Sequence, residues 1–308
     1  MEASALTTLV RDQRRWSLTA NALKASIEQT RWIILGMAVA GAILETGGAQ
    51  IHATSPALAA AFGYLGAAVL AVAAAIRQAK LGHERTQAWI MARAGSESLK
   101  REMYLFAAAA GPYSSGNAAL TLLDRKEQIL AKLQSCQKYR VEPKGELEAF
   151  GSLDAATYLN ERISGRDGQI QYLTDRADTY AGRQKLLNNV ELSLAVIAAL
   201  LGAAVTMTEK QAYGAWVAVI TTVSGAIASH ALAQRYEQLV IVFRATADRL
   251  AVAQDRWSAK GGASVAELVE SCEAVLFEEN QGWIAGADQG TVPAQDSVSP
   301  VRVKANMD

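Results

Sequence analysis

The uncharged stretch ALAAAFGYLGAAVLAVAAAI, from Ala57 to Ile76, is the strongest structural signal in this 308-residue chain. Arg77 and Lys80 follow it at once. A helix of about twenty apolar residues spans the hydrocarbon core of a bilayer, which is roughly 30 Å thick, whereas a helix of a soluble protein carries a polar face. The stretch therefore predicts a transmembrane helix.

Three further apolar segments predict an all-α membrane protein with two transmembrane hairpins. Residues 32–51 precede the first helix across a short turn, although Glu45 interrupts their apolar run. The run before Glu45, residues 32–44, is only about thirteen residues long, and a run of that length can also be a core helix or a re-entrant segment. The strongly apolar segment at 57–76 nevertheless favours a spanning hairpin. Residues 190–208 and 212–232 form the second hairpin. Sparse alternation of polar and apolar residues argues against strands.

The hairpins divide the chain into two helical units. We expect the first unit over residues 1–140, a linker over 141–151, the second unit over 152–286 and a disordered tail over 287–308. Long charged helices should continue from the spans, with Gly82 as a weak point where glycine lowers helix propensity.

A short internal repeat supports two copies of one unit. Arg93-Ala94-x-x-Glu97-x-Leu99 follows the second span, and Arg244-Ala245-x-x-Asp248-x-Leu250 follows the fourth. Both fit the pattern R-A-x-x-acid-x-L. The hairpins should then point the same way, and the helices after Ile76 and Leu232 should run side by side.

Positive charge predicts the orientation. The segments outside the two turns carry roughly fourteen Lys and Arg near the membrane, and positive residues accumulate on the cytoplasmic side. The turns carry only Lys210. Both termini should be cytoplasmic, in a multi-pass protein of the bacterial inner membrane.

Composition and motifs exclude several function classes. Lys+Arg equals Asp+Glu at 30 each, which argues against nucleic acid as the main partner. Cys136 and Cys272 lie far apart, so no disulfide framework is expected. His83-Glu84 lacks the second histidine of a zinc-protease motif, and no phosphate-binding loop is present. We expect no enzyme activity, metal site or cofactor.

Polar side chains inside the spans are candidates for lining an ion pathway, because they are costly in lipid and usually face protein or water. Glu45 could line a pore mouth, or it could extend its carboxylate to the nearby interface. Thr221, Thr222 and Ser224 lie in the middle of the fourth span. Their hydroxyls could line a pore, or they could bond to helix backbone.

Residues at the span ends and small residues within the spans give weaker signals. Glu191 and His230 could gate a pathway, or they could be interfacial and packing residues. Three small-residue patterns allow helices to approach closely in a bilayer: Gly36-x-x-x-Ala40, Gly63-x-x-Gly66 and Gly225-x-x-Ala228. These patterns fit tight hairpins and oligomers equally well.

Three stretches outside the spans carry a family resemblance. They are SESLKREMYLF at 96–106 followed by GPY at 111–113, YLxxR at 158–162 leading to Gln169 and Tyr172, and EENQGW at 278–283. Together they resemble the bacterial SLATT proteins, two-transmembrane effector domains, here in tandem. The resemblance implies a membrane effector of bacterial conflict systems, which opens a pore when a nucleotide-signal sensor fires.

The expected partners are the lipid bilayer, further copies of the chain, and a nucleotide-signal sensor or another conflict-system protein. The resembling stretches contain the candidate interface or gating residues, which can equally pack the helices: Lys100, Arg101, Glu102, Tyr104, Tyr113 and Trp283. The alternative function is a non-conducting scaffold or sensor whose cytoplasmic helices bind a partner.

Overall fold

The structure is a computed structural model, and it describes residues 2–114, 116–145, 150–151, 153–208, 211–262 and 264–289. The described part is all-α. Its α-helices are α1 (Glu2–Ile51), α2 (Pro56–Lys80), α3 (His83–Ala107), α4 (Ala118–Lys132), α5 (Ala155–Tyr158), α6 (Gln169–Thr208), α7 (Gln211–Gln234), α8 (Tyr236–Ala259) and α9 (Val265–Gln289). Two short 3₁₀ turns and one π-helical turn, Leu159–Ile163, connect them.

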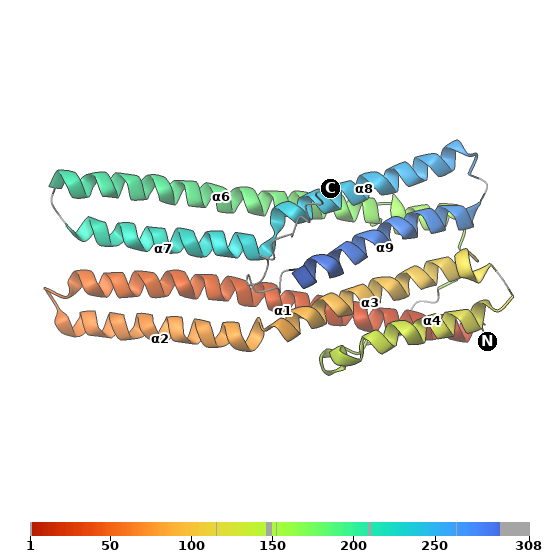
Figure 1. Cartoon of the computed structure of the whole chain (residues 1–308), viewed down its shortest axis with the longest axis horizontal. Coiled ribbons are helices and arrows are strands. Elements are labelled where there is room, and N and C mark those ends of the chain that lie inside the picture. The colour runs from red at the N-terminus through yellow and green to blue at the C-terminus, as the bar shows by residue number, and fades with distance from the viewer. Residues whose placement is uncertain are drawn as a thin grey trace, which may run out of the picture.

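Two long helical hairpins form one half of the molecule. Helices α1 and α2 pack together, as do α6 and α7, and both hairpin tips lie at the same end (Figure 1). Within the described residues, four helical segments are long and apolar enough to cross a membrane, and at most 17% of each apolar window is buried within the protein. Since so much apolar surface would be unfavourable in water, the hairpins fit a lipid environment. The predicted fold class and the common direction of the hairpins are confirmed.

The outgoing helices are continuous, whereas the returning helices break. Helix α1 runs without interruption through the weak first span. Helix α2 ends at Lys80, and Gly82 has an extended ψ of 150° before α3 begins, so the predicted weak point is a break. Arg235 has a left-handed φ of 51° and interrupts the helix between α7 and α8. Both returning helices are therefore interrupted, α2–α3 at Gly82 and α7–α8 at Arg235. The sequence pattern did not predict the second interruption.

The helices outside the hairpins stack in a fixed order. In the half away from the hairpin tips, α9 packs between α3 and α8, and α4 packs on the other side of α3 (Figure 1). The expectation that α3 and α8 run side by side is therefore wrong, because α9 folds back into the space between them.

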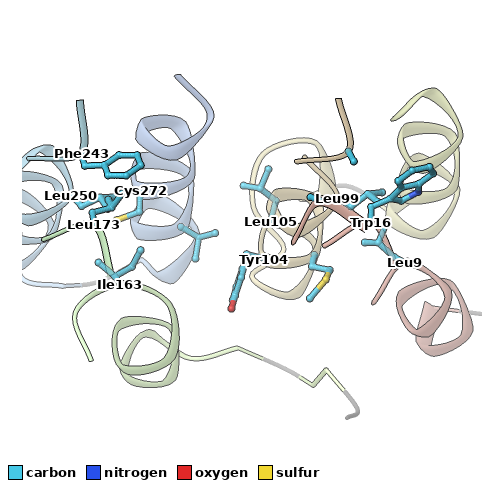
Figure 2. Close-up of a cluster of buried hydrophobic side chains, with 14 of the residues drawn as sticks. Leu9, Trp16, Leu99, Tyr104, Leu105, Ile163, Leu173, Phe243, Leu250 and Cys272 are labelled. Atoms are coloured by element: carbon cyan, nitrogen blue, oxygen red, sulfur yellow. The ribbon is translucent and has the colours of Figure 1, made fainter. Parts of the chain in front are cut away.

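One buried hydrophobic core in this half takes side chains from both units. Leu99 and Leu105 lie near Trp16 in one group, while Phe243 and Leu250 lie in a second group (Figure 2). The repeated Leu99 and Leu250 are both fully buried. Burial of such side chains stabilises the fold by about 1.5–3 kcal/mol each, which explains why this half holds its helices together without lipid.

Some predicted segments lie partly outside the described residues. Lys210, in the second hairpin turn, lies outside the described residues. So do residues 290–308, which make up most of the predicted tail. Within the predicted linker, the backbone N–H of Val141 donates to Thr19 Oγ1 at 2.9 Å, so this part of the linker is fastened to α1.

Candidate functional site

A buried ion pair joins distant parts of the chain at the junction of the two units. Arg162 Nε donates to Glu273 Oε1 at 2.9 Å, and its Nη2 donates to Glu273 Oε2 at 3.2 Å. The side chains are only 2% and 1% exposed. Tyr158 donates its hydroxyl to the same carboxylate at 3.1 Å. Such a bidentate ion pair fixes the orientation of the two side chains in addition to pairing their charges.

A π-helical turn positions Arg162. Residues 159–163 form this turn between α5 and α6, and single π turns in helices are frequent at functional sites. The turn requires glycine after it. A Cβ at Gly165 would lie 1.8 Å from the carbonyl oxygen of Asn160, and a Cβ at Gly168 would lie 2.5 Å from that of Ile163.

Residues of α3 complete the cluster and connect it to the first unit. The Tyr104 ring lies 5.0 Å from the guanidinium carbon of Arg162, which is cation–π distance. Glu97 Oε2 lies 3.9 Å from Arg162 Nη2. The Arg162 guanidinium and, after it, burial lower the pKa of Lys100 to about 8. The cluster of Glu97, Lys100, Tyr104, Arg162 and Glu273 therefore couples α3 electrostatically to the second unit.

Two opposed effects set the charge of Arg162 and Glu97. Burial works against the charge of Arg162, but the Glu273 carboxylate more than offsets it and the pKa of Arg162 is raised. Burial also works against the charge of Glu97, yet Arg162, Lys100 and Arg93 together lower its pKa. Both side chains are therefore charged at neutral pH.

A second polar cluster anchors the end of α3. Tyr113 donates its hydroxyl to Glu102, which is almost fully buried. Arg125 on α4 and Arg101 each lie 3.4 Å from Glu102 Oε1. The Arg101 guanidinium also lies 4.8 Å from the Phe277 ring centroid on α9. The structure thus brings the predicted residues 100–104 and Tyr113 to the contacts between α3, α4 and α9.

A polar cavity of about 130 Å³ lies beside the cluster, between α1, α3, α6 and α9. Both signs of charge line it, with Lys24 and Arg93 facing Glu97 and Glu279. Lys24 is also 3.2 Å from the Tyr180 hydroxyl. Four helices from both units therefore line a polar cavity at their junction.

The predicted pore-lining residues lie at two depths. The rings of Trp32 on α1 and His230 on α7 meet at 4.5 Å, which sets the register of the two hairpins. Glu45 lies thirteen residues, about 20 Å, beyond Trp32 towards the tips, while Thr222 lies eight residues, about 12 Å, from His230 in the same direction. Glu45 and Thr222 are thus not brought together within one chain.

The predicted pore-lining residues have different surroundings. The Glu45 side chain is exposed, although its Cγ packs against Gly66 of α2. The Thr221 and Thr222 hydroxyls donate to the carbonyls four residues earlier at 2.9 Å, as the backbone-bonding alternative predicts. Ser224 is half-buried.

The residues at the span ends take different positions. His230 is buried against Trp32, and beside it Arg31 donates to Gln234 Oε1 at 2.9 Å, so this end of α7 packs against α1. Glu191 is half-buried on α6. The side chain of Trp283 lies outside the described residues.

Glu273 and the cavity were not predicted from the sequence. Tyr158 and Arg162 belong to a stretch with family resemblance, but no local pattern pairs Arg162 with a residue 111 positions away. The buried acid within the apolar face of α9 was the available signal, because a fully buried carboxylate requires a partner. Among the described residues, no group of His, Cys, Asp and Glu could hold a metal ion.

Comparison with known families now identifies part of the chain. Residues 158–283 match the family model described as SMODS and SLOG-associating 2TM effector domain 1, SLATT_1. The chain contains a SLATT_1 domain. Its match begins at Tyr158 and ends at Trp283, and so includes the second hairpin and the Arg162–Glu273 pair.

The first unit matches a second family model. Residues 14–119 match a family described as a protein of unknown function, DUF4231. Together the SLATT_1 and DUF4231 matches confirm the predicted family resemblance. No curated protein and no solved structure matches the chain.

Proposed function

We propose that several copies of this protein assemble in the bacterial inner membrane and form or regulate an ion-conducting pore, as an effector of a bacterial defence system. In this proposal both termini are cytoplasmic and the protein acts without catalysis. The family description of the second unit as a 2TM effector domain supports the effector role. A SMODS- or SLOG-containing protein that handles a nucleotide signal is the proposed trigger, because the family is described as associating with such proteins.

The observation that carries the proposal is the exposed carboxylate of Glu45. It lies within a span that is apolar enough to cross a membrane, yet its side chain is exposed rather than enclosed by the other three spans. A charged group facing lipid is costly. Further copies of the chain would enclose it and supply water, which turns an unfavourable lipid contact into a ring of carboxylates around one axis.

A ring of Glu45 carboxylates would select ions by their charge. Rings of Asp or Glu concentrate cations at a pore mouth. The exposed Thr221 and Thr222 hydroxyls, about 8 Å deeper by helix rise, would add polar atoms without charge, since each already donates to its own helix. The proposed pathway is therefore cation-selective.

The test is current recording from purified protein in planar bilayers. Glu45→Gln should lower cation conductance or selectivity several-fold at low salt, and Glu45→Lys should lower it further. The wild-type and Gln currents should converge at high salt, because the Debye length falls to roughly 3 Å at 1 M. Glu237→Gln, an exposed acid at the start of α8, is the matched control and should leave the current unchanged.

Two results would contradict the proposal. Conductance that is identical in wild type and Glu45→Gln at low salt would remove Glu45 from the pathway. Absence of current in every condition, including added nucleotide signals and candidate partner proteins, would favour a non-conducting scaffold.

A further inference from the structure

The two units stack as if they were successive members of a longer series. In the half away from the tips the order is α4, α3, α9, α8, and in the hairpin half it is α2, α1, α7, α6 (Figure 1). The second unit thus repeats the order of the first. The units meet through α3 on α9 and through α1 on α7. This leaves α8 at one end of the described stack and α4 at the other.

The internal contact between the units uses one stripe on each helix. On α3, the carbonyl of Ala94 accepts a hydrogen bond from Asn280 Nδ2 at 3.3 Å. Two turns further along, Arg101 lies against the Phe277 ring. Near the end of α3, the backbone N–H of Gly111 donates to the Glu270 carboxylate. The stripe on α9 is therefore Glu270, Phe277 and Asn280.

The internal repeat locates the equivalent stripe on α8. Aligning Arg93 with Arg244 superposes the fully buried Leu99 and Leu250. Residues Ala94, Glu97 and Arg101, which face the second unit, then correspond to Ala245, Asp248 and Val252. All three are exposed on α8, and Val252 is 47% exposed although it is apolar.

A separate alignment, of α4 with α9, locates the equivalent stripe on α4. Helices α4 and α9 each follow the returning helix of their unit and pack against it, and each carries a fully buried leucine near its start, Leu122 and Leu268. With these aligned, Glu270, Phe277 and Asn280 correspond to Asp124, Ala131 and Gln134, just beyond the end of α4. All three are exposed.

The two stripes keep the acid and the amide of the internal contact and replace its Arg101–Phe277 pair. Asp124 replaces Glu270 as an acid, and Gln134 replaces Asn280 as an amide that can donate to a carbonyl. Ala245 replaces Ala94 with the same small side chain. Val252 and Ala131 replace the Arg101–Phe277 pair with two small, exposed apolar side chains.

We infer that the exposed stripe of α8 in one copy docks on the exposed stripe of α4 in a second copy, and so repeats the internal α3–α9 contact between chains. The contact is head-to-tail, and a head-to-tail contact generates a ring when its rotation closes. It also places α6 beside α2 of the next copy, which continues the order of the spans. The inference deepens the proposed function, on which it rests, by naming the surfaces that join the copies.

Cysteine cross-linking tests the predicted register. Val252→Cys and Ala131→Cys combined in one chain should give a ladder of dimers, trimers and larger species in membranes under mild oxidation. Disulfides form when the Cα atoms are about 4.4–6.8 Å apart. The native Cys136 and Cys272 are buried, so the parent chain should stay monomeric on the gel. Co-expressed single variants should stop at the dimer.

Each single variant is also a control for symmetry. In a head-to-tail contact Val252 meets Ala131 and not itself, so neither single variant should cross-link alone. Strong dimers from Val252→Cys alone would instead indicate a two-fold contact and overturn the inference. A double variant that cross-links no better than the singles would overturn it as well.

Charge exchange provides a second test that does not depend on oxidation. Val252→Glu places an acid opposite Ala131 and one helical turn from Glu127, so the oligomer mass in detergent should fall while helicity and thermal unfolding remain unchanged. Adding Ala131→Lys in the same chain should restore the mass. Ser258→Glu, about 100° around α8 from this stripe, should have no effect. Failure of rescue would contradict the predicted pairing.

These results separate the interface from the function. An oligomer that conducts ions but shows neither cross-link nor rescue would retain the proposed function and exclude this surface. Cross-linked ladders from a protein that never conducts would retain the surface and exclude the pore.

Discussion

At the scale of single residues, the Arg162–Glu273 pair holds the second unit against α3. Removing one partner from such a pair leaves a buried, uncompensated charge, which costs about 3–5 kcal/mol. Arg162→Met should therefore lower the free energy of unfolding in detergent by about that amount. Arg162→Met combined with Glu273→Leu should recover part of the loss, because the orphaned carboxylate is gone.

The exposed pair between Arg244 and Asp178 is the matched control. Its side chains are 57% and 65% exposed at an N–O distance of 3.0 Å. Exposed pairs typically contribute less than about 1 kcal/mol, so Arg244→Met should change the unfolding free energy only slightly. Equal losses for Arg162→Met and Arg244→Met would contradict the structural role of the buried pair.

At the scale of elements, close approach of α1 and α2 fixes the first hairpin. A Cβ at Gly48 would lie 2.9 Å from the carbonyl oxygen of Ala59, which is backbone and cannot rotate away. Gly48→Leu should therefore separate the helices and destabilise the protein by about 1–3 kcal/mol. A Cβ at the neighbouring Gly47 would have nothing within 4 Å, so Gly47→Leu should be tolerated in the same unfolding measurement.

Helix existence followed from the sequence, whereas helix contacts largely did not. The four spans were predictable because length and lack of charge are local properties. Of the predicted small-residue positions, Gly36, Gly63 and Gly225 have open space beside them, whereas Gly66 lies at a close approach of α1 and α2, where a Cβ would be 3.1 Å from the Gly41 carbonyl oxygen. Close approach depends on which helix faces meet. The sequence could not place α9 between α3 and α8, because that depends on packing between segments far apart in the chain.

The candidate site was predicted in part for the same reason. Residues 100–104 stood out through family resemblance, and the structure places them where α3 meets α4 and α9. Glu273 pairs with Arg162 across 111 residues, and no spacing in the sequence encodes such a contact. Thr222 was a candidate pore residue with a backbone-bonding alternative, and its hydroxyl makes that backbone bond.

At the scale of the whole molecule, the account depends on two similar hairpins crossing one membrane in the same direction. Both tips lie at one end (Figure 1). Core residues labelled in Figure 2, such as Leu99 of α3 and Leu250 of α8, belong to helices of the other half. An outward-facing tip and an inward-facing core would agree with the excess of Lys and Arg outside the turns.

Cysteine labelling in intact cells measures this topology directly. Thr54 lies exposed in the turn between α1 and α2, and Ser258 lies exposed near the end of α8. A membrane-impermeant thiol reagent should label Thr54→Cys in intact cells, and should label Ser258→Cys only after the membrane is permeabilised. Equal labelling of both positions in intact cells, or labelling of Ser258→Cys alone, would contradict the four-span arrangement.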